Sequence, residues 1–200
     1  MNLQELLYPV LFGLVVVLVT AAEAKVGKSW PDPPAWKDKA KMARYLANYA
    51  DWGVVSAISP DFGYIPFGTL QSISDGPLGN GTGTHYFYMS PWSDTYHNLK
   101  YNNSVSLFIS QAESDYCQSQ SMDPEEPICS RVTLMGRITP VKDQTEENVA
   151  KQYLFTRHPA MKTWPASHGW KFLKLNLTAI CLLDYYGGAT HLSVEDYYKA

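Results

Sequence analysis

Residues 153–188, YLFTRHPAMKTWPASHGWKFLKLNLTAICLLDYYGG, decide how this chain folds. The first half crowds basic and aromatic side chains around two prolines: Arg157, His158, Lys162, Trp164, His168 and Trp170. Pro159 ends any helix that precedes it, because proline disfavours helical geometry at the residue before it. The second half predicts strands at Trp170–Leu177 and Ile180–Tyr185. The stretch is therefore either a rigid corner between a helix and a strand, or an active site rich in basic residues.

The elements on either side of this stretch are mostly strands. Arg131–Val141 alternates apolar and polar residues, as a half-buried strand does. Asp143 and Glu146 have the spacing of a capping box and open a helix through Phe155. Ser193 with Asp196 starts a short C-terminal helix in the same way. The remaining expected elements are a helix at Asp38–Ala50, strands at Trp52–Ser59, Phe67–Ile73, Thr84–Met89 and Ser104–Ser110, and a glycine-rich loop at 74–83. This order predicts a mainly β fold, an antiparallel barrel with flanking helices.

The length and charge fit one domain, or at most two small ones. The chain has 200 residues and a net charge of −3. Its basic residues do not cluster, which argues against nucleic acid as a partner.

The N-terminus predicts export. Residues 1–24 contain an apolar run at Val10–Val19, then Ala22-Glu23-Ala24, the pattern of a signal-peptidase site. The segment before the run has no Lys or Arg, so an N-terminal membrane anchor is the rival interpretation. The run is too short to span about 30 Å of hydrocarbon, and we favour a cleaved signal peptide. Residues 25–37 then form a flexible lead-in, residues 38–200 form the folded domain, and no membrane insertion is expected after cleavage.

Three cysteines fit an oxidising compartment. Cys117 and Cys129 flank the polar segment QSQSMDPEEPI, and a disulfide there would add about 3 kcal/mol on the chain-entropy estimate. A zinc site is disfavoured, because the spacing matches no zinc pattern and no histidine is near. Cys181 lies in an apolar run and is expected to be a buried free thiol.

Three sequons make the chain a candidate glycoprotein. They begin at Asn80, Asn102 and Asn176. A used sequon must be exposed, because a glycan cannot be packed into a core.

The sequence contains no strong catalytic motif. It has neither a G-x-S-x-G elbow nor an H-E-x-x-H helix. The glycines of Gly79–Gly83 are not followed by a lysine or a helix, so a solvated loop is favoured over a phosphate cradle. The five histidines lack metal-ligand spacing. We therefore expect no catalytic residue and no metal.

Residues 153–188 resemble the C-terminal half of split-barrel proteins related to the pyridoxamine-phosphate oxidases, in which a helix also ends in RHP and a strand pair ends in two glycines. Upstream matches are ADWGVVSAIS, PFGTL, SDGP, YFYMSP and HNLKYNNSVSLFIS. With the export features, the chain is identified as a member of the CREG family of secreted cellular-repressor glycoproteins, over Ala43–Tyr198. The resemblance implies an FMN-binding split β-barrel and a homodimer with cofactor sites between subunits. It also implies structural roles for His158 and His168.

The resemblance argues against a bound flavin here. Relatives that bind FMN place a basic residue where this chain has Ser104, and the phosphate needs such donors. If FMN binds, its contacts would come from Thr95, Tyr96, Lys100 and Arg137. CREG proteins are regarded as having lost flavin binding, so we expect no cofactor.

Two functions of different classes follow. The favoured one is a non-enzymatic secreted and lysosomal glycoprotein that influences cell growth and differentiation. It would act through a glycan-reading receptor of the mannose-6-phosphate/insulin-like-growth-factor-II type, with indirect effects on transcription. The alternative is an FMN-dependent oxidoreductase.

Overall fold

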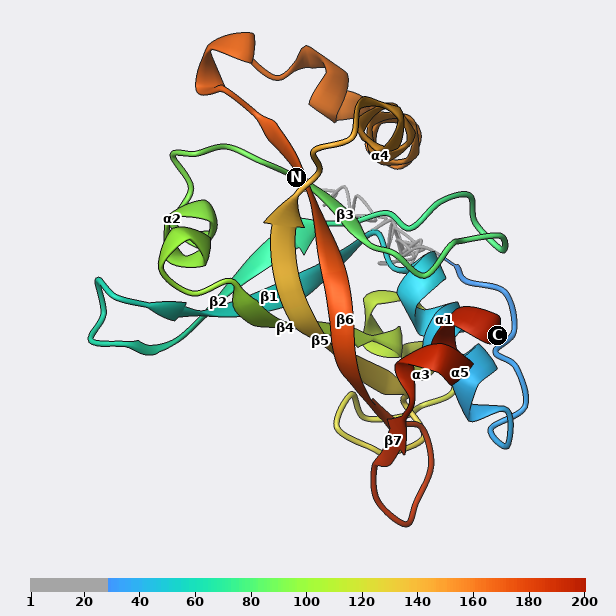
Figure 1. Cartoon of the computed structure of the whole chain (residues 1–200). Coiled ribbons are helices and arrows are strands. Elements are labelled where there is room, and N and C mark those ends of the chain that lie inside the picture. Colours follow the sequence, from blue (N-terminus) through green and yellow to red (C-terminus); the bar gives the residue numbers. More distant parts are fainter. Residues whose placement is uncertain (1–28) are drawn as a thin grey trace, which may run out of the picture.

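The computed structural model describes residues 29–200. The predicted signal peptide and the first residues of the lead-in lie outside this range. One antiparallel sheet of seven strands dominates the molecule (Figure 1). Its order is β2-β1-β4-β5-β6-β3, and β7 also pairs with β6. The strands are β1 Trp52–Ser59, β2 Ile65–Ser72, β3 Tyr86–Met89, β4 Ser104–Ser110, β5 Arg131–Pro140, β6 Lys171–Leu183 and β7 Thr190–Leu192.

The sheet curls into a half-barrel that is closed by a single bridge. Ser74, just after β2, exchanges backbone hydrogen bonds with Tyr86 of β3, although β2 and β3 are the two ends of the main strand order. The alternation of apolar residues in β5 is confirmed, since Val132, Leu134 and Ile138 all face the core. The inner face is therefore apolar and the outer face is mixed.

The prediction of two separate strands after Trp170 is wrong. β6 is one strand of 13 residues, and its register with β5 shifts between Met135 and Gly136. A Cβ on Gly136 would lie 2.0 Å from the carbonyl oxygen of Asn176, so only glycine allows this approach. This irregularity accommodates Thr178, where the alternation of the strand is interrupted. In the sequence this interruption resembles the end of a strand.

Helices cover the two ends of the half-barrel (Figure 1). α1 (Lys39–Tyr49) and α5 (Val194–Lys199) lie together at one end, while α4 (Gln144–Arg157) packs on β3 and β6. The core-facing side of α1 carries Met42, Ala43, Leu46 and Ala47.

α2 (Asp94–Tyr101) and β7 were not predicted from the sequence. The buried residues of α2 are Thr95, Asn98 and Leu99, so the helix has no apolar stripe to reveal it. Its one local signal is the N-cap, where Ser93 Oγ accepts the Tyr96 N–H at 3.2 Å.

The predicted capping box at α4 is only half correct. Asp143 accepts the Glu146 N–H at 2.8 Å, as expected. The Glu146 carboxylate does not bond back to the backbone; it lies 2.7 Å from Lys174 Nζ on β6. An ion pair between α4 and β6 therefore takes the place of the expected bond from Glu146 to the N-cap backbone. Ser193 does start a helix, since it accepts the Asp196 N–H at 3.0 Å.

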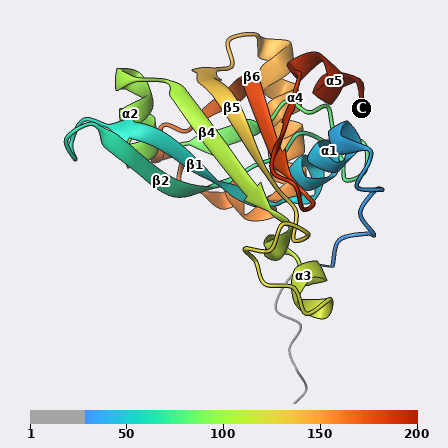
Figure 2. The same ribbon diagram turned by 90° about the horizontal axis from the view of Figure 1, so that it is seen from below.

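A disulfide joins Cys117, in α3 (Tyr116–Ser119), to Cys129. Figure 2 shows α3 and its loop beyond the end of the sheet, away from the core. Cys181 is free but only half-buried, so the prediction of a buried thiol is wrong. Its neighbours Ile180 and Leu182 take the inner face of β6, and alternation sends Cys181 outward.

In the segment expected to be a flexible lead-in, Trp30 is buried against the rings of Tyr45 and Tyr49.

No helix within residues 29–200 is long and apolar enough to cross a bilayer.

Candidate functional site

The RHP corner ties three segments of the fold together. The guanidinium of Arg157 donates to the carbonyl oxygens of Asn48 and Ala50, at 2.8 and 3.1 Å, and to that of Gly76 at 2.8 Å. It also lies 3.6 Å from the carboxylate of Asp51, and only 6% of its side chain is exposed. Arg157 therefore satisfies the last carbonyls of α1, which a helix leaves without partners.

The histidines near the corner also have structural partners. His158 Nε2 lies 2.9 Å from the carbonyl oxygen of Ile73. The ring of His168 lies 4.8 Å from that of Trp92, and its backbone carbonyl accepts the hydroxyl of Ser90. His85 is buried with Nε2 at 3.0 Å from the Ala47 carbonyl, and burial lowers its pKa. The partners of these histidines are backbone carbonyls and an aromatic ring, as expected at a corner between a helix and a strand.

The glycine-rich loop is exposed at residues 77–80, as its composition suggests, but it is anchored at its base. Its stem is buried, and Asp75 is fully enclosed. Asp75 accepts the side-chain amide of Asn48 at 2.6 Å and the Gly83 N–H at 3.0 Å. The N–H groups of Gly79 and Thr82 donate to the Asn48 side chain and the Asp75 carbonyl. Because these donors are already used inside the protein, the loop offers no phosphate cradle.

The residues expected to meet a flavin phosphate gather only in part. Ser104 and Arg137 are cross-strand partners on β4 and β5, and both line a hollow of about 460 Å³ on the outer face of the sheet. Tyr96 and Lys100 line a different hollow of about 180 Å³ beside α2. Thr95 is buried, and its hydroxyl is hydrogen-bonded to Thr69 and Gln71.

Arg137, the cation that lines the first hollow, already has a hydrogen-bond partner. Arg137 Nη1 donates to the Asn103 side chain at 3.0 Å. Ser104 supplies a short neutral hydroxyl where a second cation would be needed to offset a dianion. The residues of one chain therefore do not fit an FMN phosphate. Within residues 29–200, no group of three His, Cys, Asp or Glu side chains is placed to hold a metal ion.

The three sequons lie at the surface of this fold. Asn80 and Asn176 are exposed, and Asn102 is partly exposed at the end of α2. Asn176 is the cross-strand neighbour of Arg137, while Asn102 lies two residues before Ser104. Two of the sequons thus border the outer-face hollow.

A family model described as "CREG, beta-barrel" matches residues 34–199. The chain belongs to the CREG family. It is 39% identical to human Protein CREG1 over 197 residues, covering 93% of this chain and 89% of that protein. It is 36% identical to human Protein CREG2, covering 87% of this chain and 60% of that protein. The family expected from the motifs is confirmed.

Solved structures place this CREG chain in the split-barrel fold. A pyridoxinephosphate-oxidase-family protein from Clostridium acetobutylicum superposes with a TM-score of 0.56 at 11% identity, over 80% of this chain and 99% of that one. A heme-binding protein from Mycobacterium smegmatis gives a TM-score of 0.62 at 16% identity, over 85% of this chain and 62% of that one. At such identities the likeness concerns the fold alone.

Sequence reasoning missed the residues that organise the glycine-rich loop of this CREG protein. Asn48 and Arg44 lie on α1 among ordinary helix residues, and nothing local marks their partners in the loop at 74–83. Asp75 of the SDGP motif was a usable signal, because an acidic residue next to glycine in a predicted loop often bonds to backbone N–H groups.

Proposed function

We propose that this CREG protein is a non-enzymatic glycoprotein, secreted and delivered to endosomes and lysosomes, that influences cell growth and differentiation. In this proposal its glycans are read by a receptor of the mannose-6-phosphate/insulin-like-growth-factor-II type. Effects on transcription are indirect, because an exported protein acts through signalling or uptake.

The observation that carries the non-enzymatic part is the scattered phosphate site. A bound FMN needs several converging donors around a dianion. Here Ser104 and Arg137 share one hollow, Tyr96 and Lys100 share another, and Thr95 is enclosed. A flavin-dependent oxidoreductase is the second candidate, supported only by the split-barrel fold.

The disulfide and the exposed sequons support export. The Cys117–Cys129 bond suits an oxidising compartment. Asn80 and Asn176 are exposed residues, as a glycan requires.

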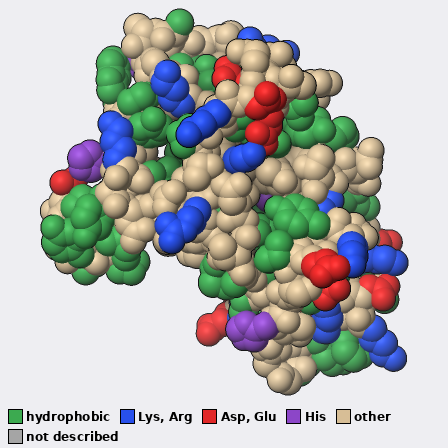
Figure 3. All heavy atoms as spheres, viewed as in Figure 1, with side chains coloured by type: hydrophobic (Ala, Val, Ile, Leu, Met, Phe, Trp, Pro, Cys, Tyr) green, Lys and Arg blue, Asp and Glu red, His purple; other side chains and the backbone are tan. Residues whose placement is uncertain are grey.

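The outer face of the half-barrel supports a homodimer. Leu70 on β2 and Phe108 on β4 are 59% and 39% exposed there. At the tip of the β1–β2 hairpin Phe62, Tyr64 and Ile65 are each more than half exposed, and Figure 3 shows hydrophobic side chains gathered over this tip. Exposed large apolar side chains of this kind mark an interaction site. A second copy fits it, because two identical subunits expose the same face to each other.

The test uses full-length protein secreted from a mammalian cell line. We expect a purified protein without visible flavin absorption and without saturable quenching of FMN fluorescence at micromolar FMN. We also expect uptake by cells that free mannose-6-phosphate inhibits. A control preparation treated with an endoglycosidase should lose the uptake while keeping its fold. Saturable FMN binding would favour the oxidoreductase instead, and uptake that is indifferent to both treatments would contradict the receptor.

A further inference from the structure

A cluster of aromatic side chains lies at the RHP corner. Two short 3₁₀-helical turns, η2 (Pro159–Thr163) and η3 (Ala166–His168), follow α4 and lead into β6. The ring of Trp170 lies 4.6 Å from that of Trp164 and 5.1 Å from that of Tyr88 on β3. The ring of His168 lies 5.8 Å from that of Trp170 and 4.8 Å from that of Trp92. We call these five residues, Tyr88, Trp92, Trp164, His168 and Trp170, the aromatic corner.

The exposure of the aromatic corner is built into the fold. Trp92 is 72% exposed and Trp164 is 37% exposed. The backbone beside them is anchored, because the Trp170 indole donates to the Pro165 carbonyl at 2.9 Å and Met161 in η2 is buried. Exposed large apolar side chains on an anchored backbone mark an interaction site.

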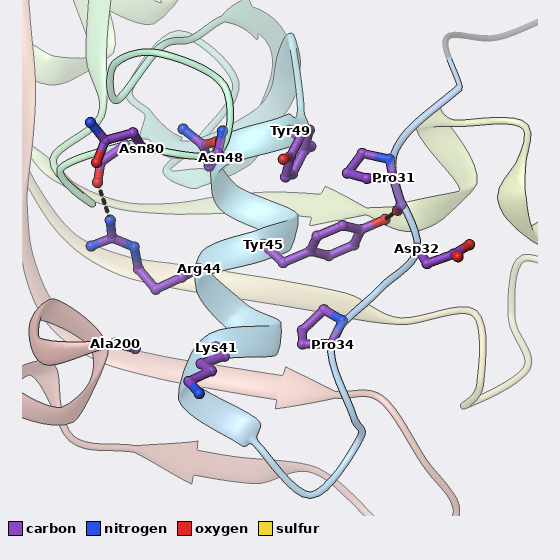
Figure 4. A pocket seen from close by; sticks show the side chains of 12 residues that line it. Pro31, Asp32, Pro34, Lys41, Arg44, Tyr45, Asn48, Tyr49, Asn80 and Ala200 are labelled. Atoms are coloured by element: carbon purple, nitrogen blue, oxygen red, sulfur yellow. Dashed lines mark hydrogen bonds between the residues drawn. The ribbon is translucent and has the colours of Figure 1, made fainter.

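The aromatic corner lies on a projecting part of the molecule. Figure 1 shows η2 and η3, the orange segment between α4 and β6, beyond the body of the sheet. Small-molecule sites are concave, as is the groove of about 450 Å³ beside α1, where Tyr45 and Tyr49 point toward residues 31–34 (Figure 4). A projecting surface fits a broad partner better than a small molecule.

The chain around the corner is locally basic. Residues 148–183 contain no Asp or Glu, although the whole chain has a net charge of −3. Their basic residues are Lys151, Arg157, Lys162, Lys171 and Lys174. Arg157 and Lys174 form ion pairs within the protein, and the other three are exposed. Charge complementarity therefore favours an anionic partner.

Two of the exposed lysines adjoin the aromatic rings. Lys162 is in η2, two residues before Trp164. Lys151 Nζ lies 5.9 Å from the centre of the Phe155 ring, which lies 5.3 Å from that of Tyr88. The aromatic and the basic side chains thus form one surface.

This combination favours a lipid surface over a protein or a nucleic acid. Lys is depleted in protein interfaces, whereas Trp lies at the headgroup level of membranes and Lys is attracted to anionic lipids. Nucleic-acid bases stack on open ring faces, but the rings of Tyr88, Trp164 and Trp170 pack on one another.

We propose that the aromatic corner binds the surface of membranes that contain anionic lipids. Trp92 and Trp164 lie at the level of the headgroups, and Lys151 and Lys162 face the negative charge. The protein lies on such a membrane without crossing it. This contact needs neither a glycan nor a receptor, so it goes beyond the proposed function.

The test uses full-length exported protein and vesicles of phosphatidylcholine, with and without phosphatidylserine. The protein should sediment only with the mixed vesicles, with a shift of its tryptophan emission to shorter wavelength, and added salt should weaken the binding. Replacing both Trp92 and Trp164 by alanine should abolish the shift and lower the affinity roughly tenfold. Lys151→Gln and Lys162→Gln should each lower it roughly fivefold. Asp94→Asn, which removes an exposed negative charge two residues after Trp92, should strengthen it.

Tyr186→Ala and Lys199→Gln are the matched controls. Tyr186 is 62% exposed on the turn between β6 and β7, and Lys199 is exposed at the end of α5. Figure 1 shows both elements away from the corner, so neither change should alter the binding. Circular dichroism checks that every variant folds, and the lysine variants test the contact independently of the tryptophans.

Several results would overturn the inference. They are the absence of sedimentation with mixed vesicles, equal sedimentation with neutral vesicles, and equal losses in the control variants. Binding to a soluble sulfated polysaccharide in place of vesicles, unchanged without the two tryptophans, would assign the lysines to a glycan and also overturn it. None of these results changes the flavin and uptake tests, so the proposed function stands or fails separately.

Discussion

Replacing Arg157 by alanine tests whether the RHP corner is structural. The guanidinium bonds three backbone carbonyls and lies beside Asp51, and its side chain is nearly buried. Burial lowers the pKa of Arg157, because it removes water from the charged guanidinium. The carbonyls and Asp51 offset part of this desolvation cost. Removing one partner of such a buried polar cluster costs about 3–5 kcal/mol, because the acceptors lose their donors. For a domain of this size the melting temperature should fall by roughly 6–20 °C, at 2–4 °C per kcal/mol.

Arg131 provides the matched control. Its guanidinium also donates to backbone carbonyls, those of Pro124 and Glu125, but these bonds are exposed to solvent. Arg131→Ala should change the free energy of unfolding by less than about 1 kcal/mol. Arg157→Lys should recover little, since one ammonium cannot reach three carbonyls that the planar fork reaches.

The assay is urea unfolding of the three variants, followed by tryptophan fluorescence and far-UV circular dichroism. If Arg157→Ala loses less than about 1 kcal/mol, or no more than Arg131→Ala, the structural account of the corner is refuted.

Other predictions follow from the pH, the surface and the disulfide. Burial raises the pKa of the Glu113 carboxyl from its ordinary value of 4.5 to about 8. Protonated Glu113 therefore contributes fully to the stability of the fold below pH 4.5, and this contribution is lost as the pH rises through about 8. Between pH 6.5 and 8 the protein should lose about 1–2 kcal/mol in urea unfolding, and Glu113→Gln should flatten this slope; an unchanged slope would show that another group titrates. Leu70→Asp should shift sedimentation at micromolar concentration from dimer to monomer, while Leu78→Asp, at an exposed leucine of the glycine-rich loop, should not; equal effects would place the interface elsewhere. Replacing Cys117 and Cys129 by serine should speed amide exchange only in residues 111–130 and cost at most about 3 kcal/mol. Faster exchange in β1 as well would mean that the bond supports the core.

Several features could be read from the sequence because they depend on neighbouring residues. Pro159 ends α4 within two residues, since its ring restricts the residue before it. Asp143 and Ser193 cap their helices because the donor they accept is three residues away. The alternation in β5 follows from the two-residue period of a strand that faces a core on one side.

The site depended on contacts between distant residues. Arg157 reaches carbonyls 107 and 109 residues earlier in the chain, and Asn48 reaches Asp75 on another element. Local propensity does not predict such pairs. The bonds form only after the sheet has curled and brought α1, the glycine-rich loop and α4 together. Arg137 and Lys100, which the sequence placed in one phosphate site, line two different hollows. Sequence motifs identified the family and located the corner. The curl of the sheet decided which polar groups bond to one another inside the protein and which remain free to bind a ligand.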